Sequence, residues 1–317
     1  MRHRPLGTTG LLVSEVGFGC WQLGGEGWGA FRTEDGIRAV RRALELGISL
    51  FDTAPVYGFG RSEELLGRAL RGAAAEAAIV SKAGLVWDEG RRVAHDNRPE
   101  SIARSLEGSL KRLGVERLDV LLLHWPDPRV PLEESIAELE RLRSSGKIRA
   151  WGLSNHPAAA VLSVERALED AARRGAGPVL EYPANAAQSF APEYEESGRA
   201  GEALRPLAEA RSWGFVAFDV LLRGILAGRW GPERRFGKRD LRRRDPRYRG
   251  AGLARSLEAA RRVSEVAKAL GAPPAAVAIR GILDRGGVSS CLVGMRSAAQ
   301  VEECARASDL TPPVSLA

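Results

Sequence analysis

The chain has 317 residues, too many for one small domain but normal for one (β/α) barrel or two α/β domains. Hydrophobic residues make up 44% of it and charged residues 27%, as in soluble globular proteins. The net charge is +7, but the basic residues are mostly arginine and are interleaved with glutamate, so we interpret the excess as a solvated surface rather than a nucleic-acid site.

The sequence carries no signal for secretion, a membrane span or a bound metal. The N-terminus lacks an apolar signal segment and no run reaches the length of a membrane span, which predicts a cytoplasmic protein without a membrane partner. The three cysteines show neither disulfide nor metal spacing, and the four histidines form no ligand pair. We therefore expect no metal site.

Short apolar runs alternate with amphipathic stretches along nearly the whole chain. A Gly/Thr turn within residues 5–13 predicts an N-terminal hairpin. Strands are then expected at residues 16–19, 48–51, 78–82, 118–124, 148–154, 179–182, 215–220 and 288–293. Helices are expected to begin near Thr33, Ser62, Pro99, Pro131, Pro157, Glu202, Leu253, Pro274 and Ser297.

Apolar strands flanked by amphipathic helices indicate a parallel sheet covered on its outer face. Eight such units in about 300 residues favour a closed α/β barrel of the (β/α)8 TIM type over a doubly wound sheet. No linker or shift in composition divides the chain, so residues 1–317 are predicted to form a single domain.

Polar side chains follow three consecutive predicted strands. Asp52 ends the second strand, Lys82 the third and His124 the fourth, while Tyr57 lies in the loop after the second. Because strand C-termini share one face of a barrel, we expect these side chains to meet. A buried Lys82 needs a partner such as Asp52, and its charge is expected to lower the pKa of Tyr57. Such a tyrosine suits proton transfer at a carbonyl or alcohol oxygen, whereas the competing interpretation is a buried ion pair with a capping histidine.

Several motifs carry a family resemblance. They are Gly17–Trp21, Asp52–Gly58, Ser81–Lys82, Leu123–Pro126, Gly146–Asn155 and Gly294–Ser297. In their order and spacing the chain resembles the aldo-keto reductase family over essentially its whole length. The resemblance implies a (β/α)8 barrel with the N-terminal hairpin closing its bottom, and hydride transfer between a nicotinamide cofactor and a carbonyl. It assigns Tyr57 as general acid, Lys82 to lower its pKa, Asp52 as the lysine's partner and His124 to position the substrate oxygen.

The cofactor phosphates are expected at the loops after the last two strands, because no Gly-x-Gly-x-x-Gly fingerprint follows the first. Gly294 and Arg296 lead into a helix whose N-terminus suits a phosphate monoester. By resemblance this is the adenosine 2′-phosphate site, which favours NADPH over NADH, and Gln300 and Glu303 match adenosine contacts. Cys304 stands where the family commonly has asparagine.

The nicotinamide side departs from the family. Ser154 and Asn155 match the residues that hold the carboxamide. The family's usual Gln-x-x-Tyr-Asn, however, reads Glu-Tyr-Pro-Ala-Asn at residues 181–185. We expect Glu181 to replace the glutamine and Ala184 the tyrosine that stacks on the nicotinamide. The stacking ring is then missing, unless a register shift by two brings Tyr182 into its place.

Residues 218–228 match the loop that covers the pyrophosphate, where Leu221 and Gly224 are expected to contact the cofactor. Asp219 stands where serine is frequent, and its carboxylate would repel phosphate if it pointed inward. The basic segment from Arg234 to Arg249 is either a lid that closes on the cofactor or a solvated, disordered loop.

Trp21, Trp87 and Trp125 fall in loops on the active face and are expected to wall a pocket for a small carbonyl substrate. The predicted function is NADPH-dependent reduction of an aldehyde or ketone, by a monomer or weak homo-oligomer. Two alternatives remain at this point. One is a cofactor-binding barrel with little turnover that serves as a regulatory or binding subunit, and the other is an NAD(P)-dependent sugar dehydrogenase.

Overall fold

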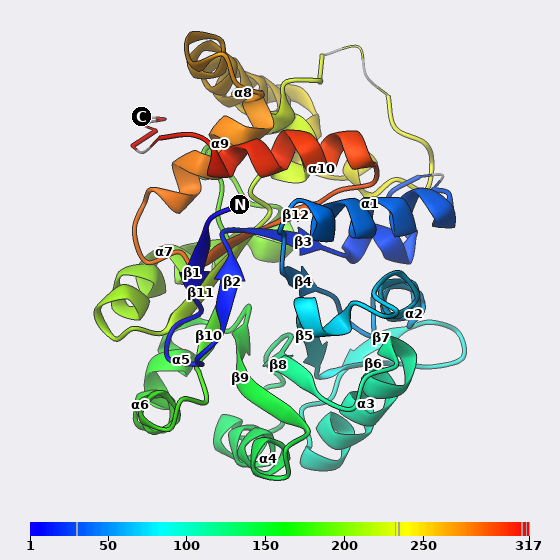
Figure 1. Ribbon diagram of the computed structural model, residues 1–317, viewed down its shortest axis with the longest axis vertical. Coiled ribbons are helices and arrows are strands. Elements are labelled where there is room, and N and C mark those ends of the chain that lie inside the picture. The colour runs from blue at the N-terminus through cyan, green and yellow to red at the C-terminus, as the bar shows by residue number, and fades with distance from the viewer. Residues whose placement is uncertain (30, 232, 234, 312, 315, 317) are drawn as a thin grey trace.

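The computed structural model describes the whole chain except residues 30, 232, 234, 312, 315 and 317. Within the described part, eight parallel strands close into a barrel in the order β10-β11-β12-β3-β4-β5-β8-β9, which confirms the predicted fold. These strands are β3 Val16–Gly19, β4 Leu50–Asp52, β5 Ala78–Ala83, β8 Leu118–Leu123, β9 Ile148–Ser154, β10 Val179–Pro183, β11 Gly214–Phe218 and β12 Ser290–Gly294. Figure 1 shows the helices arranged around them.

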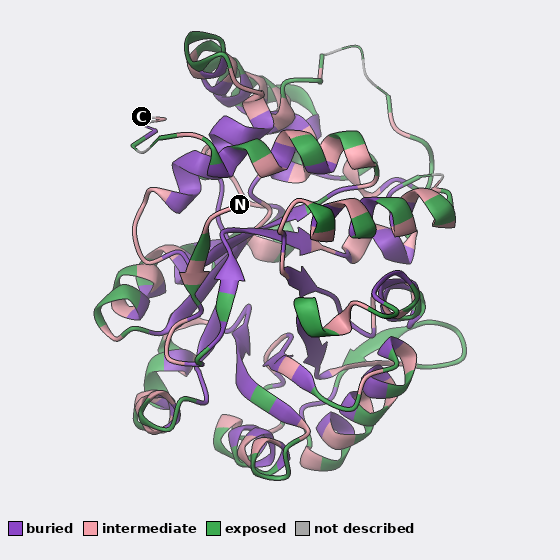
Figure 2. Ribbon diagram, in the orientation of Figure 1, coloured by how far each residue is buried: buried purple, intermediate pink, exposed green. Residues whose placement is uncertain are grey.

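The helices cover the outside of the barrel, with their buried faces toward the strands and their exposed faces outward (Figure 2). They are α1 Thr33–Glu45, α2 Arg61–Ala69, α3 Pro99–Leu113, α4 Leu132–Ser144, α5 Ala158–Ser163, α6 Glu165–Arg173, α7 Glu195–Ala210, α8 Gly250–Leu270, α9 Pro274–Leu283 and α10 Ala298–Ala305. The helix expected from residue 157 to 173 is divided into α5 and α6, because Val164 has a non-helical φ of −109°. Helix α7 begins seven residues before the expected Glu202, immediately after the turn η3 Pro192–Tyr194.

The N-terminal hairpin of β1 His3–Pro5 and β2 Leu12–Ser14 closes the bottom of the barrel, as expected. Its Leu6, Leu11 and Val13 are buried in one cluster with inward-facing strand residues such as Leu50 and Val216. Because the hairpin supplies these apolar side chains, the lower interior of the barrel is a packed core rather than a channel.

A network of charges around the buried Glu15 and Arg280 lies beside this hairpin, with Arg2 and Arg4 half-buried. Glu15 accepts hydrogen bonds from Arg2 Nε at 2.9 Å and from Arg280 Nη1 at 3.0 Å, while Arg4 pairs with its other oxygen at 3.0 Å. Arg280 also pairs with Asp284. Burial alone raises the pKa of Glu15, but the hydrogen bond from Ser308 and the charge of Arg280 bring it below the usual value. We call these residues the bottom cluster.

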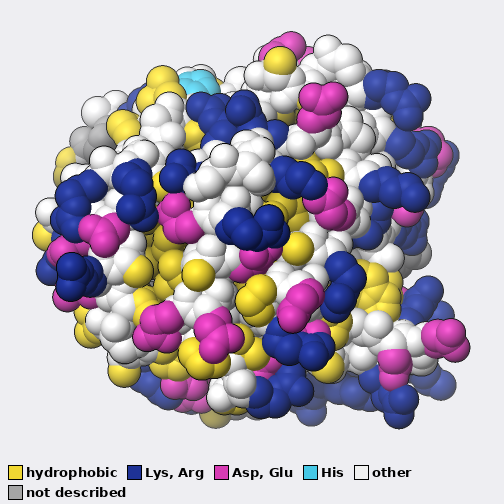
Figure 3. All heavy atoms as spheres, turned by 90° about the horizontal axis from the view of Figure 1, so that it is seen from below, with side chains coloured by type: hydrophobic (Ala, Val, Ile, Leu, Met, Phe, Trp, Pro, Cys, Tyr) yellow, Lys and Arg dark blue, Asp and Glu magenta, His cyan; other side chains and the backbone are white. Residues whose placement is uncertain are grey.

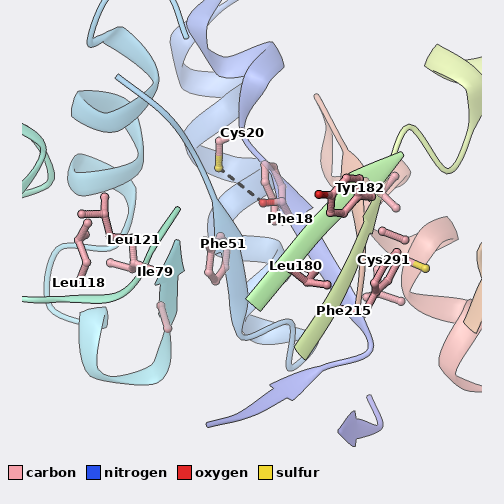
Figure 4. Packing of buried hydrophobic residues seen from close by; sticks show 14 of the residues in the cluster. Phe18, Cys20, Phe51, Ile79, Leu118, Leu121, Leu180, Tyr182, Phe215 and Cys291 are labelled. Atoms are coloured by element: carbon pink, nitrogen blue, oxygen red, sulfur yellow. Dashed lines mark hydrogen bonds between the residues drawn. The ribbon is translucent and has the colours of Figure 1, made fainter. Parts of the chain in front are cut away.

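Residues between the strands and the helices form the larger core, and Figure 4 shows part of it. Phe51 of β4 packs there with its ring 5.9 Å from that of Phe18. Successive strand residues point to opposite faces, so Asp52 next to Phe51 faces the barrel interior. The same alternation turns Tyr182 of β10 outward and Glu181 inward. Which residues of a strand pack against the helices therefore decides which polar groups of that strand face the barrel interior.

Two parts of the fold were not expected. Strands β6 Leu85–Trp87 and β7 Val93–His95 form an antiparallel hairpin after β5. The segment between β11 and α8 contains the 3-10 turns η4 Leu222–Ala227, η5 Leu241–Arg243 and η6 Pro246–Tyr248. Three further short turns are η1 Trp21–Gly24, η2 Ala74–Glu76 and η7 Arg306–Ser308.

On the face shown in Figure 3, Lys and Arg side chains are interspersed with Asp and Glu.

In the described part of the chain, no single helix combines the length and apolar composition of a membrane span, although α8 and α9, bent by 99°, meet that test as a pair. Among the same residues, no group of His, Cys, Asp and Glu is placed to hold a metal ion.

Candidate active site

The barrel brings Asp52, Tyr57, Lys82 and His124 together at the C-terminal ends of its strands. Asp52 is the last residue of β4, and Lys82 lies at the corresponding end of β5. His124 directly follows β8, where its backbone N–H donates to Ala83 O at 2.9 Å. The rings of Tyr57 and His124 meet edge to face with their centroids 5.7 Å apart, and Lys82 Nζ lies 5.5 Å from the centre of the tyrosine ring.

The position of Tyr57 is fixed by a contact between two backbones. A Cβ atom on Gly24 would come within 2.6 Å of the carbonyl carbon of Tyr57, and one on Gly58 within 2.3 Å of Gly24 O. Gly58 also has a φ of +65°, which disfavours any other residue. The tyrosine loop thus rests directly on η1, a fit that only glycine permits at both positions.

Lys82 is surrounded by two acids. It donates hydrogen bonds to Asp52 and, at 3.2 Å, to Thr53 O. Its Nζ also lies 3.3 Å from Glu181 Oε1, and all three charged side chains are at least 95% buried. Asp52 and Glu181 therefore both face the same buried lysine. We call Asp52, Lys82 and Glu181 the mouth cluster.

The predicted lowering of the pKa of Tyr57 by Lys82 is wrong for this structure. Burial raises the pKa of Tyr57 well above its usual value, and the charges of Asp52 and Glu181 raise it further. The prediction left out the effect of burial, and it counted one carboxyl group beside the lysine, whereas the structure places two. The phenol therefore stays protonated, as a proton donor must be before it reacts.

His124 is a neutral partner in this site. Burial, together with the charge of Lys82, holds its pKa well below the usual value. A neutral imidazole can donate one hydrogen bond without adding a second buried cation beside Lys82. His124 O in turn accepts a hydrogen bond from Asn155 Nδ2 at 3.0 Å, which ties the ends of β8 and β9 together.

A cavity of about 380 Å³ opens beside these residues, and we call it the mouth cavity. It runs from Tyr57 and His124 to the N-terminus of α10. The predicted cofactor residues that line it are Asn155, Glu181, Leu221, Gly224, Gly294, Arg296, Gln300 and Glu303. Ser154 is absent from its walls, because the side chain is fully buried and donates to Glu181 O at 3.0 Å. Glu303, although on the wall, is paired with Arg229.

The register of β10 decides whether the ring of Tyr182 can face the mouth cavity. Tyr182 is buried on the helix side, where its hydroxyl donates to His156 O at 2.7 Å and its ring stacks on Phe215. A Cβ on Gly201 of α7 would lie 2.7 Å from Tyr182 Cβ, so the helix packs closely on this side chain. Tyr182 therefore does not face the mouth cavity, and no register shift brings its ring there.

Asp219 lines the mouth cavity, but its charge is compensated. Its carboxylate pairs with Arg247 Nη1 at 2.5 Å and accepts the backbone N–H of Arg223 at 3.1 Å. Arg247 also pairs with Asp245, which in turn pairs with Arg223. The predicted repulsion between Asp219 and a phosphate is therefore reduced by a buried neighbouring cation.

Much of the basic segment is folded against the mouth cavity. Leu241 N donates to Gly27 O at 2.9 Å, and Arg242 Cζ lies 4.8 Å from the ring of Phe236 and 5.4 Å from that of Trp28. Asp240 caps η5 and pairs with Arg242. Residues 240–248 thus form capped turns, whereas residues 235–239 are mostly exposed and lack regular structure, and Arg234 lies outside the described residues.

Arg296 lies at the far end of the mouth cavity. Its Nη1 donates to Trp28 O at 2.8 Å, and its guanidinium lies 5.2 Å from the ring of Phe31. Burial, with the charge of Arg242 added, lowers the pKa of Arg296. Two guanidinium groups that disfavour each other's charge would both be stabilised by an anion between them.

The three tryptophans predicted to form a substrate pocket differ in position. Trp21 lines the mouth cavity and stacks on Tyr57 at 6.0 Å. Trp125 lies behind Tyr194, a cavity residue, and stacks on it at 5.7 Å. Trp87 is on the β6–β7 hairpin against Phe59, away from the cavity walls. Tyr194 itself was missed, because nothing in its local sequence distinguishes a loop tyrosine that returns to the barrel mouth.

The mouth cavity fits a nicotinamide dinucleotide by two observations. Gln22 and Trp28 line it, and their buried atoms Oε1 and Nε1 have no hydrogen-bond partner among the described residues. Such atoms are costly unless a ligand or water satisfies them. Arg296 and Arg242 at one end of the cavity match the charged phosphate end of such a cofactor. Tyr57 at the other end matches its reactive nicotinamide end.

Comparisons with known proteins agree with this geometry. Residues 15–313 match the model of the Aldo/keto reductase family. Aldo-keto reductase YhdN of Bacillus subtilis is 34% identical over 307 residues, covering 95% of this chain and 87% of the relative. The NADH-specific methylglyoxal reductase of Escherichia coli is 39% identical over 170 residues, covering 49% of this chain and 52% of the relative.

Among solved structures, the glycerol dehydrogenase AKR11B4 from Gluconobacter oxydans superposes with a TM-score of 0.81 at 34% identity, covering 96% of this chain and 89% of that one. The family match spans nearly the whole chain, and the same stretch builds the barrel and its mouth. The chain therefore belongs to the aldo-keto reductase family of NAD(P)H-dependent oxidoreductases.

Proposed function

We propose that this protein reduces an aldehyde or ketone to the alcohol with NADPH, and that Tyr57 is the general acid. The observation that carries the proposal is the meeting of a protonated tyrosine and a neutral histidine over one cavity. Both groups face that cavity, and both are held there by buried contacts. A pair of hydrogen-bond donors is what a carbonyl oxygen needs as it becomes negative.

The bound nicotinamide would supply the hydride to the carbonyl carbon. Tyr57 donates its proton to the carbonyl oxygen as negative charge develops there, and His124 orients that oxygen by a hydrogen bond. Lys82 stays protonated, because Asp52 and Glu181 outweigh the effect of burial and raise its pKa. Its positive charge opposes the rise in negative charge on Tyr57 as the proton leaves.

We infer NADPH rather than NADH from the arginine pair at the far end of the cavity. Arg296, with Arg242 nearby, suits a phosphate monoester on the adenosine ribose. Replacing Arg296 by alanine should weaken NADPH binding by about thirtyfold and leave NADH binding within about twofold. Fluorescence titration with both cofactors measures this. Equal loss for both cofactors would remove the argument for a 2′-phosphate site.

The rings around the cavity favour a small or medium carbonyl compound. Trp21, Tyr194 and Phe218 line the cavity next to Tyr57 and present flat apolar walls. Stopped-flow NADPH oxidation with a panel of aldehydes, ketones and sugars tests this proposal. Tight NADPH binding without turnover of any of them would contradict it and favour a binding or regulatory role.

Oxidation of an alcohol is a second candidate, because a structural relative is named a glycerol dehydrogenase. The same residues would act in reverse, with Tyr57 accepting the alcohol proton. The high pKa of Tyr57 makes it a protonated group at neutral pH, which favours reduction. Measuring both directions at pH 7 and at alkaline pH separates the two candidates.

A further inference from the structure

The mouth cluster holds one more acid than its lysine can neutralise. Asp52 and Glu181 are 4% and 3% exposed, and both lie on Lys82, which is 1% exposed. If all three side chains were ionised, a net charge of −1 would be buried beside Tyr57. Burying an uncompensated charge is costly, and a carboxyl group in such a place takes up a proton instead.

The geometry also identifies where this proton resides. The carboxyl groups of Asp52 and Glu181 both lie against Lys82, and the negative charge of Asp52 opposes ionisation of Glu181. Lys82 donates directly to Asp52 but lies 3.3 Å from Glu181. Asp52 is therefore the better-stabilised anion, and Glu181 is the acid that keeps the proton.

We propose that Glu181 is a positioning residue that carries a proton at neutral pH, and that loss of this proton sets the alkaline limit of carbonyl reduction. The proposal rests on the reductase function proposed above. It concerns this chain in particular, because Glu181 stands where the family resemblance expects a glutamine. A protonated glutamic acid matches glutamine in size and in lacking charge, whereas an ionised one does not.

In the described part of the chain, Glu181 has no ion pair with any cation other than Lys82. Asp52 and Lys82 face it from β4 and β5, and Tyr57 and His124 lie in the adjoining loops. On β9, Ser154 donates to the backbone carbonyl of Glu181 rather than to its carboxyl group. Its register partner on β11 is the apolar Val216. Each further negative charge in this set makes Tyr57 a weaker acid.

The charge balance agrees with the pKa values of the groups. Burial raises the pKa of Glu181 to about 8, with the charge of Asp52 adding to the effect and that of Lys82 opposing it. Glu181 therefore ionises at mildly alkaline pH. Its ionisation raises the pKa of Tyr57 still further and so weakens proton donation to the substrate oxygen.

The pH dependence of kcat/KM for aldehyde reduction tests the proposal. In the native enzyme we expect this rate to fall above pH about 8. Glu181→Gln should move the fall upward by at least about one pH unit relative to the native enzyme. Glu181→Asp keeps an ionisable group and should retain a fall in rate, and the exposed Glu107→Gln should leave the profile unchanged. The same alkaline fall in the native enzyme and in Glu181→Gln would overturn the proposal.

A second measurement does not depend on turnover. Infrared difference spectroscopy of the whole protein, recorded from neutral to alkaline pH, should show the carbonyl stretch of a protonated carboxyl group, lost as the pH rises through about 8 and absent from Glu181→Gln over the same range. If the band is missing from the native protein at neutral pH, the inference fails even if the enzyme is active. If the band titrates as expected but no carbonyl compound is reduced, the proposed function fails while the protonation of Glu181 stands.

Discussion

Two clusters of buried charge lie at opposite ends of this barrel, and they differ in balance. The bottom cluster surrounds Glu15 with three arginines, whereas the mouth cluster surrounds Lys82 with two acids. At the bottom, burial raises the pKa of Glu15, but the hydrogen bond from Ser308 and the charges of the arginines bring it below its usual value. Burial at the mouth raises the pKa of Glu181 to about 8. A buried acid with surplus cations stays ionised and supports the fold, while one that lacks them holds a proton available for chemistry.

Replacing the proposed general acid, Tyr57, should give the largest difference between the two ends of the barrel. Tyr57→Phe deletes a hydroxyl from the mouth without disturbing either cluster. Reduction should fall by about a thousandfold, because general acid catalysis contributes on this scale. NADPH affinity and the melting temperature should stay near their native values. Steady-state kinetics with the same aldehyde gives the comparison, and activity within tenfold of native would mean that another group delivers the proton.

Removing the central cation of each cluster should affect stability unequally. Arg280→Met leaves Glu15 buried with fewer partners and should lower the free energy of unfolding by about 3 kcal/mol. Lys82→Met leaves two acids that can both take up protons, so the loss should be smaller, at about 1 kcal/mol. Urea unfolding at pH 7 measures both.

Lys147→Met is the matched control for these two variants, since it breaks an exposed pair with Glu107 and should cost less than about 0.5 kcal/mol. Equal losses for Arg280→Met and Lys82→Met would contradict the distinction between the clusters.

The clusters should also respond to opposite ends of the pH scale. The pKa of Glu181 is raised by folding, so its contribution to stability is present at acid pH and is lost as the pH rises toward about 8. Glu181→Gln should therefore be more stable than the native protein at pH 9, by on the order of 2 kcal/mol, and similar to it at pH 5.

Glu15 behaves in the opposite sense, because folding lowers its pKa. Its contribution is present at neutral pH and is lost as the pH falls below the usual value of 4.5. Thermal unfolding of the native protein and of Glu181→Gln across the pH range measures these trends. A native stability that does not decline on the alkaline side would contradict the raised pKa of Glu181.

A smaller effect, on NADPH affinity, is expected at Asp219, whose charge is balanced by Arg247. Arg247 neutralises Asp219, so Arg247→Gln should expose a carboxylate to the cofactor's phosphates and weaken NADPH binding by about tenfold. Adding Asp219→Ser to this variant should restore most of the affinity. Fluorescence titration of the single and double variants measures the coupling. Native affinity in Arg247→Gln would indicate that Asp219 does not face the phosphates.

The sequence was sufficient for the barrel and for the residues at its strand ends. Each apolar run predicts one buried strand, and the polar residue that closes it predicts which groups meet, as with Asp52 and Lys82. The pKa of Tyr57 was mispredicted because burial raises it, with the charge of Asp52 adding to the effect. A further contribution comes from Glu181, and only the register of β10 shows that this residue faces Lys82.

The β6–β7 hairpin and Tyr194 were also missed. The hairpin strands have three residues each, with β6 half-buried and β7 exposed, so they lack the long apolar run of a barrel strand. Tyr194 reaches the mouth through tertiary packing on Trp125 and Phe218, which its neighbours in sequence do not encode.

The contact between Gly24 and Gly58 separates the fixed position of the catalytic tyrosine from the residues of the pocket that can be substituted. It locks the loop of Tyr57 to the barrel through backbone atoms alone. The rings that face the same cavity, such as Tyr194 and Phe218, come from other segments. Substitutions there can reshape the pocket without displacing the tyrosine, so the choice of substrate can be redesigned, or can diverge in evolution, while the reaction is retained.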